Sequence, residues 1–265
     1  MAVTYRHGIS ILELIIYLPS LFLSIFLVIR HGLRTNSGFL FLTTFTLTRI
    51  VGACCDLATI NNFTVGLYVA AAICSSIGLS PLMLACTGLL SRADMSIEKT
   101  SGRTALPRIT FPFFRILTVV AMILSIVGIT ANMSAEGLQH PDIKVKIGMI
   151  LYVVCWVVML ALLAVLAMHR GSIERGEKPT LLAVALSSPF ILVRLLYAFF
   201  VWFLHNSEFS MLDGNVTIQL VMVVLEEFAV VAICLTVGMT LRVRGHESRR
   251  GEEEVMPAYS SSKPR

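Results

Sequence analysis

Residues 147–168 read IGMILYVVCWVVMLALLAVLAM, an unbroken apolar stretch without an acidic or basic side chain. A bilayer core of about 30 Å needs roughly 20 residues of helix, because each residue rises about 1.5 Å. This stretch is therefore long enough to cross a membrane. Six other stretches meet the same requirement, at residues 9–29, 38–60, 65–90, 113–131, 181–204 and 216–241. The sequence predicts an all-α polytopic membrane protein, a bundle of seven transmembrane helices.

The composition supports lipid rather than water as the solvent of most of the chain. Of 265 residues, 56% are hydrophobic and only 14% are charged, with a mean hydropathy of +0.83. The formal charge is +5, but the basic residues lie between apolar stretches and in the tail, not along one stripe. This favours membrane lipids over nucleic acid as partners. The six cysteines lie inside apolar stretches and no Cys/His cluster has metal-ligand spacing, so no metal or cofactor is expected.

The charges between the predicted spans indicate an orientation. Sixteen Lys and Arg residues, counting Arg115 at the edge of its span, lie on one side of the predicted membrane and three on the other, apart from Arg49 and Arg194 within spans. Because the more basic side is usually cytoplasmic, we expect the N-terminus outside and the C-terminus in the cytoplasm. The predicted location is a multi-pass protein of the plasma membrane or an endomembrane.

Three Asn-x-Ser/Thr triplets, at Asn62, Asn132 and Asn215, fall in loops that this orientation places outside. They are candidate N-glycosylation sites, although such triplets are also common by chance.

Two domains are expected: a seven-helix transmembrane domain over residues 1–241 and a disordered cytoplasmic tail over residues 242–265. The tail has few apolar residues and blocks of opposite charge, which disfavour a packed domain. Its basic start either binds anionic lipid or only fixes the topology. The longest loop, residues 91–112, is also polar and basic, and with the tail it forms the predicted surface for a cytoplasmic partner.

Acidic and basic side chains inside the spans are the most informative feature for function, because each costs roughly 2.5–3.5 kcal/mol at the bilayer centre. These side chains are Glu13, Arg49, Asp56, Arg194, Glu226 and Glu227. From the helical rise, Arg49, Arg194 and Glu226 lie about 15 Å from a membrane surface. Glu13 and Asp56 lie about 6 Å below the outer surface. The sequence thus predicts a midplane group and a shallower acidic level.

Two interpretations of these charges remain open. In the first, Arg49, Arg194 and the Glu226–Glu227 pair form the floor of a polar, outward-facing cavity that holds a ligand, substrate or proton. In the second, they form a buried ion-pair network that fixes helix register, or a glutamate is simply protonated. Adjacent helical residues differ by about 100°, so the two glutamates cannot point the same way. We expect Arg194 to pair with one of them.

Further features concern packing. Pro19, Pro81 and Pro189 lie within spans, where proline kinks a helix. The third span is rich in Ala, Ser and Gly, which predicts a central packing helix. All six histidines, His31 among them, lie outside the apolar centres and are expected to be solvated or interfacial.

A set of short motifs resembles those of a family of uncharacterised fungal seven-span integral membrane proteins, a domain of unknown function. The motifs are Arg30-His31-Gly32, Arg49-Ile50-Val51-Gly52, Ser80-Pro81, Ser188-Pro189-Phe190, Arg194-Leu195-Leu196-Tyr197 and Glu226-Glu227. The resemblance implies a fold and a fungal source but no activity. The topology is also similar to that of fungal lipid-translocating exporters, an analogy of fold alone.

Three classes of function remain. The expected cavity suits a small-molecule or lipid ligand, which fits a transporter or translocator and a receptor-like sensor equally. The alternative is a membrane-embedded enzyme that acts on a hydrophobic metabolite through an intramembrane carboxyl group. The enzyme ranks third, because no common hydrolase, ATPase or protease motif is present.

Overall fold

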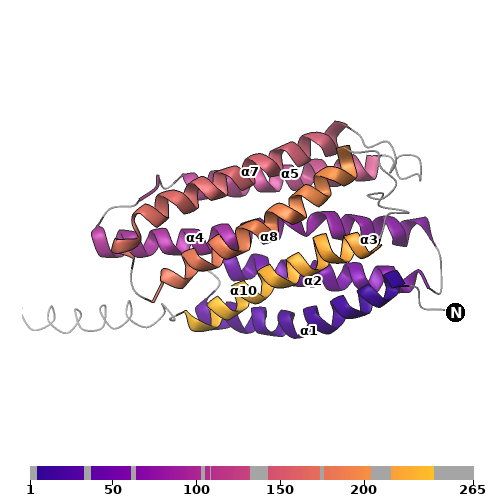
Figure 1. The fold of residues 1–265 in the computed structure, drawn as a ribbon, viewed down its shortest axis with the longest axis horizontal. Helices are drawn as coiled ribbons and strands as arrows, with labels where there is room; N and C mark the ends of the chain where they lie inside the picture. The colour runs from indigo at the N-terminus through magenta and orange to yellow at the C-terminus, as the bar shows by residue number, and fades with distance from the viewer. Residues whose placement is uncertain are drawn as a thin grey trace, which may run out of the picture.

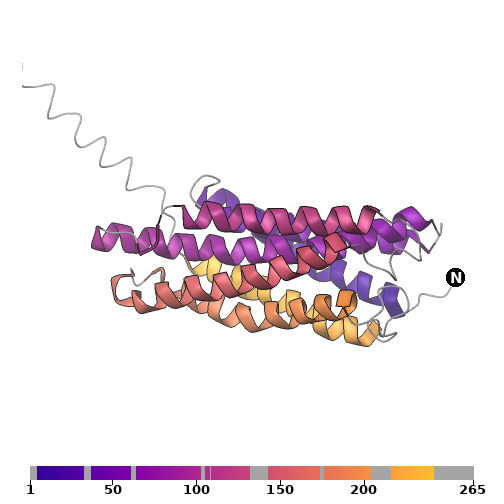
Figure 2. The same cartoon turned by 90° about the horizontal axis from the view of Figure 1, so that it is seen from above.

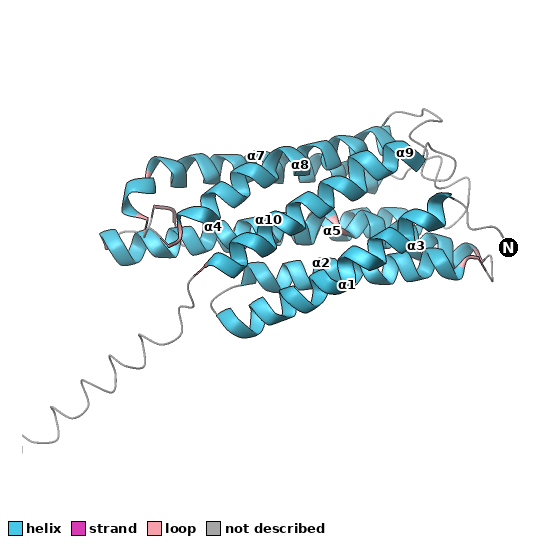
Figure 3. Cartoon of the chain, turned by 60° about the horizontal axis from the view of Figure 1, so that its bottom comes forward, coloured by secondary structure: helices cyan, strands magenta, loops and turns pink. Residues whose placement is uncertain are grey.

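The computed structural model describes residues 5–32, 37–60, 64–102, 105–107, 109–131, 143–173, 176–203 and 216–241. Every regular element in this part of the chain is helical (Figure 3). The triplets at Asn62, Asn132 and Asn215, and the tail from residue 242, lie outside the described residues.

The chain forms long helices that run side by side along one axis (Figure 1). They are α1 (Tyr5–His31), α2 (Ser37–Ala58), α3 (Val65–Ile77), α4 (Leu79–Ser101), α5 (Thr110–Ala131), α7 (Ile143–Met168), α8 (Lys178–Phe203), α9 (Val216–Gln219) and α10 (Glu226–Thr240). A short 3-10 turn, η1 (Arg170–Ser172), precedes α8, and a π-helical turn, η3 (Leu220–Leu225), joins α9 to α10. Among the described residues, seven helical segments are long and apolar enough to cross a membrane. This confirms the predicted all-α bundle of seven spans.

The outer surface of the bundle has the apolar character that lipid requires. On α1, the exposed fractions of Ile15, Phe22 and Ile29 are 63%, 70% and 76%. These residues are seven apart, so they form a single stripe along the helix. Water-soluble proteins rarely expose large apolar side chains in a continuous stripe. The chain is therefore a polytopic membrane protein by both helix length and surface.

The third span lies at the centre of the bundle. Helices α1 and α2 pack together, as do α5 and α7, and α8 and α10, while α4 contacts α2, α5, α7, α8 and α10 (Figures 1 and 2). In the apolar window of Ile73–Ser101, 71% of the residues are buried, against 28–39% in the other six spans. The prediction of a central packing helix is confirmed for α4, whereas the described small residues of α3, among them Ala70, Ala71 and Ser75, are only partly buried.

The hydrogen-bond ladder of the central span is broken at Gly78, but this residue keeps α-helical dihedral angles, φ −54° and ψ −29°, so the span is not unwound there. The sequence predicts a single helix over residues 65–90, but α3 ends at Ile77 and α4 begins at Leu79, with Gly78 between them. Pro81 explains the break, because it has no N–H and its ring clashes with the carbonyl four residues earlier, that of Ile77. The Ser80 hydroxyl donates to this Ile77 carbonyl at 3.1 Å. The break therefore arises locally and is stabilised locally.

At its other end α4 runs beyond the predicted span. It continues to Ser101 and stops at Gly102, whose φ of 68° is a left-handed conformation suited to glycine and whose N–H donates to the Glu98 carbonyl at 3.0 Å. Arg92 and Asp94, which the sequence places in a polar loop, are buried in the helix. The prediction that residues 91–112 form a loop is wrong for residues 91–101, which are helical, while a cytoplasmic partner at this segment and the tail stays a prediction. The reason is that α4 keeps a packed face there, with Glu177 supplying a partner for Arg92.

Helices α5 and α7 approach closely at two glycines, Gly128 on α5 and Gly148 on α7. A Cβ on Gly148 would lie 2.5 Å from the Ser125 hydroxyl and 3.1 Å from the Ala121 carbonyl oxygen. Small residues allow such close packing between membrane helices.

Gly148→Ala should therefore force α5 and α7 apart and lower the free energy of unfolding by about 1–3 kcal/mol, the usual cost of overpacking. Thermal unfolding in detergent measures this effect. Gly8→Ala is the matched control, because a Cβ on Gly8 would meet nothing within 4 Å. Equal stability of the two variants would show that the α5–α7 contact is not tight.

Candidate functional site

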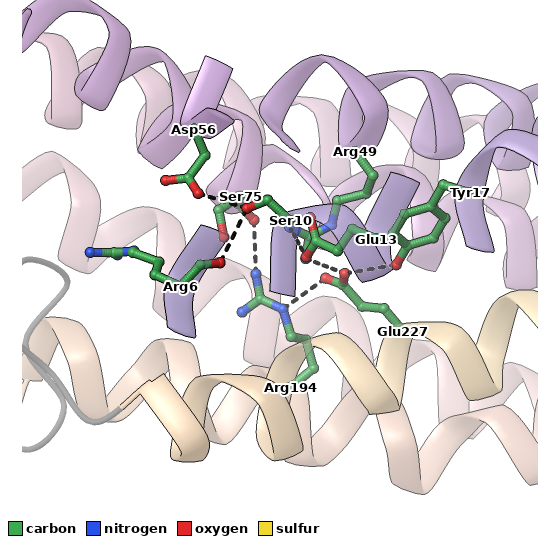
Figure 4. Close-up of polar contacts among 9 residues, drawn as sticks. All are labelled: Arg6, Ser10, Glu13, Tyr17, Arg49, Asp56, Ser75, Arg194 and Glu227. Atoms are coloured by element: carbon green, nitrogen blue, oxygen red, sulfur yellow. Dashed lines mark hydrogen bonds and ion pairs between the residues drawn. The ribbon is translucent and has the colours of Figure 1, made fainter. Parts of the chain in front are cut away.

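Four helices meet at one fully buried carboxylate, that of Glu227 in the first turn of α10. Its Oε1 accepts a hydrogen bond from Arg194 Nε of α8 at 3.0 Å. Its Oε2 accepts hydrogen bonds from Arg49 Nη2 of α2 and from the Tyr17 hydroxyl of α1, the latter at 3.3 Å (Figure 4). We call these four residues the Glu227 cluster. Arg194 thus pairs with one of the two adjacent glutamates, as expected, and its partner is Glu227.

The break in the central span lies against the Glu227 cluster. Arg194 Nη2 donates to the Ser75 carbonyl at 2.8 Å. This carbonyl belongs to the last turn of α3, where carbonyls lack partners within the helix. A Cβ on Gly78 would lie 3.4 Å from both Glu227 Oε1 and Arg49 Nε, so the break and the charges are in direct contact.

A π-helical turn directs Glu227 inward. The turn η3 ends at Leu225, directly before Glu226 and Glu227. Such wide turns are often found at functional sites, and they change the direction in which later side chains point. Glu227 is fully buried, whereas Glu226 is only partly buried and its Oε2 has no hydrogen-bond partner among the described residues. The two glutamates point in different directions, and no contact brings Glu226 into the cluster.

The shallower acidic residues lie between α1 and α2, nearer the start of α1. Glu13 Oε1 is 4.0 Å from Arg49 Nη1, and its side chain is 11% exposed. The Ser10 hydroxyl donates to Asp56 Oδ2 at 2.6 Å. Because Ser10 and Glu13 are three residues apart, they lie on one face of α1, and both acidic groups border the same space.

This space is a cavity of about 90 Å³, lined by residues from the first half of α1 and the second half of α2. Its volume is several times the ~10–15 Å³ that a cavity needs, on the same measure, to hold one water molecule. Its charged lining residues are Arg6, Glu13, Arg49, Asp56 and Arg194. The remaining lining residues are Ile9, Ser10, Gly52, Ala53, Ala71, Ser75, Leu79, Met149, Tyr197, Ala198, Val201, Trp202 and Gln219.

The structure corrects one part of the predicted floor. Arg49 and Arg194 line the cavity, but Glu226 and Glu227 do not. Glu227 is covered by the two guanidinium groups that bind it, and Glu226 points away from the cluster. The prediction that the Glu226–Glu227 pair forms the cavity floor is therefore wrong.

A second buried charged group, which the sequence analysis missed, lies toward the end where α10 finishes. Arg92 of α4 donates from Nε and Nη2 to the two oxygens of Glu177, at 2.7 and 2.8 Å. Its Nη1 is 3.4 Å from His31 Nδ1, and His31 Nε2 is 3.1 Å from the Gly238 carbonyl. The prediction that His31 is solvated or interfacial is wrong, because it is buried between α1, α4 and α10. Arg92 follows the predicted span 65–90 and Glu177 precedes the predicted span 181–204, so both lie at the same predicted membrane edge. Their opposite charges at one depth could have indicated that they form a pair.

Comparison with known proteins identifies a family for this chain, but the function of that family is unknown. The profile of a family described as a domain of unknown function (DUF7702) matches residues 3–244 of the chain. No curated protein matches the chain. No solved structure matches it either. The family match agrees with the resemblance to a family of seven-span proteins of unknown function.

Proposed function

Since the chain belongs to the DUF7702 family, a domain of unknown function, we propose its function from its own geometry. The protein binds a small polar or polar-headed ligand in the cavity and carries it across the membrane. It is a transporter or lipid translocator, and the cavity is its substrate site.

The observation that carries this proposal is that the cavity ends on paired charges beside an interruption in a helical hydrogen-bond ladder. Helices interrupted near the bilayer midplane form the binding sites of many secondary transporters. Here Gly78, at the interruption, lies against Arg49 and Glu227, and Arg194 binds the Ser75 carbonyl in the last turn of α3. Charged residues at such depth are costly, and they commonly mark substrate or ion pathways.

The two ends of the bundle differ in a way that fits one state of a transport cycle. The cavity lies toward the end where α1 begins, since Arg6, Ile9 and Ser10 line it. Toward the other end the core holds the buried Leu82, Met83 and Leu90 of α4, and the Arg92–Glu177 ion pair joins α4 to the residue before α8. Transport requires this closed end to open in a second state.

Substituted-cysteine labelling tests that requirement without a known ligand. In a background whose six native cysteines are replaced, Ala53→Cys places a thiol on the cavity wall. A membrane-impermeant thiosulfonate should modify it rapidly from the cavity side and measurably, though more slowly, from the opposite side. Ala85→Cys is the matched control, because Ala53 and Ala85 are both 2% exposed but only Ala53 lines the cavity.

Labelling of Ala53→Cys from one side only would reject transport and favour a sensor. One observation supports that second candidate: α10 connects Glu227 to Gly238, which contacts His31 beside the Arg92–Glu177 pair. A ligand at the cavity would then act through α10 on the opposite end. An enzyme receives less support, because both oxygens of Glu227 already accept hydrogen bonds. Labelling from neither side would reject the cavity as a binding site.

The orientation of the bundle is part of the proposal. The excess of Lys and Arg supports an outside N-terminus and a cytoplasmic tail, and the cavity then opens outward. Epitope tags before Met1 and after Arg265 should be accessible in intact cells only at the N-terminus. An accessible C-terminal tag would contradict this orientation.

A further inference from the structure

The chemistry of the cavity wall indicates which ligand it can hold, and this inference rests on the proposed function. Glu227 cannot be the recognition group, because its oxygens are occupied by Arg194, Arg49 and Tyr17 and it does not line the cavity. The ligand must therefore be recognised by the groups in front of Glu227.

Arg194 supplies the site for an anionic group. Its Nε and Nη2 bind Glu227 and Ser75, and Figure 4 shows its remaining nitrogen directed away from both of these partners. The side chain is 5% exposed, so this nitrogen belongs to a group held rigidly by two hydrogen bonds. A guanidinium fixed in this way suits a carboxylate or phosphate oxygen.

Glu13 and Asp56 supply the site for a cationic group. Glu13 is 8% exposed, lines the cavity and makes no hydrogen bond among the described residues, its nearest cation being Arg49 at 4.0 Å. Asp56 lines the same cavity and accepts one hydrogen bond, from Ser10. An ammonium group carries three donors and can bond to both acidic side chains at once.

The balance of charge favours a ligand that carries both groups. The cavity and the Glu227 cluster together contain three basic residues, Arg6, Arg49 and Arg194, and three acidic residues, Glu13, Asp56 and Glu227. A ligand with a net charge would leave one charge without a partner at low dielectric, which is strongly unfavourable. A zwitterion has no net charge, so the formal charge of the cavity and the Glu227 cluster together stays at zero when it binds.

We propose that the cavity binds a compact zwitterion in which a primary ammonium group contacts Glu13 and Asp56 and an anionic oxygen contacts Arg194. The ligand is either a free solute or the headgroup of an aminophospholipid. A volume of about 90 Å³ suits a solute or headgroup rather than a whole lipid. The apolar Met149 and Leu79 on the wall accommodate the carbon atoms between the two charges.

The test uses the full-length protein in phosphatidylcholine nanodiscs and follows its thermal unfolding. Glycerophosphoethanolamine and β-alanine are the zwitterionic probes, while ethanolamine and dimethyl phosphate each carry one of the two charges. At least one zwitterion should stabilise the protein saturably, with a half-saturating concentration at least tenfold below that of either single-charge probe. Nanodiscs that contain phosphatidylethanolamine identify the lipid source, because the protein in them should be stabilised without added probe.

Variants assign the ammonium site. Glu13→Gln should raise the half-saturating concentration at least tenfold, and Asp56→Asn provides a second variant if the first does not fold. Glu226→Gln is the matched control and should stay within about twofold of the parent protein, because Glu226 does not line the cavity.

The inference is overturned if a single-charge probe binds as tightly as the zwitterions, or if Glu13→Gln and Asp56→Asn leave binding unchanged. It also fails if neither zwitterion nor phosphatidylethanolamine stabilises the protein. Labelling of Ala53→Cys from both sides in that case would retain the proposed function and reject only the ligand class. Absence of labelling would reject both.

Discussion

Glu227→Leu should lower the free energy of unfolding by about 3–5 kcal/mol, the cost of leaving a buried charge without its partner. The substitution strands two guanidinium groups, those of Arg49 and Arg194, which are both nearly fully buried. The loss should appear in thermal or detergent-induced unfolding of the purified protein.

The neighbouring carboxylate provides the matched control for this effect. Glu226→Leu should change stability by less than about 1 kcal/mol, since Glu226 is outside the Glu227 cluster. Adding Arg194→Leu to Glu227→Leu should restore part of the loss, because one stranded charge is removed. Arg194→Leu alone should cost less than Glu227→Leu, because Arg49 still pairs with Glu227. Equal losses in Glu226→Leu and Glu227→Leu would contradict the assignment of Glu227 as the paired carboxylate.

Arg92→Met should also destabilise the protein by about 3–5 kcal/mol, because it removes both hydrogen bonds that the Arg92 guanidinium donates to the buried Glu177 carboxylate. The double variant Arg92→Met with Glu177→Leu should be clearly more stable than Arg92→Met, since two buried charges are replaced by apolar groups. Both effects are measured by the same unfolding assay.

Arg115→Met is the control for a surface charge, because Arg115 is exposed on α5, where its guanidinium carbon lies over the Phe41 ring, 5.4 Å from the ring centroid. Its expected loss is about 1 kcal/mol or less. If the double variant were no more stable than Arg92→Met, the two charges would not act as a pair.

The number of spans was predictable because hydrophobicity is a local property. Each span needs about 20 apolar residues, and the structure has seven such helical segments in the described part of the chain. The pairing of Arg194 with a glutamate of the last span was also predictable, since the rise per residue fixes their depths. Both inferences depend on distance along a helix, which the sequence contains.

Three features were not predictable in the same way, because they depend on how a helix is rotated about its axis and on which helices pack beside it. The choice between Glu226 and Glu227 depends on the π-helical turn η3, which a simple helical count does not include. The burial of Arg92 depends on Glu177, which is 85 residues away in the chain. His31 is buried by α4 and α10, whose positions no local pattern specifies. Arg92 lies at the end of a predicted span, so the sequence indicated only its contribution to the charge bias and not its burial.

The hydrogen bond from Arg194 to the Ser75 carbonyl ties the cavity to the last turn of α3, because the same guanidinium offers its remaining nitrogen to an anion. An anion on that nitrogen would restrain the guanidinium further, and with it the backbone that Nη2 holds. Occupancy and the conformation of the helix at Gly78 would then be thermodynamically linked: the conformation that keeps this hydrogen bond binds the anion more tightly, and binding favours that conformation.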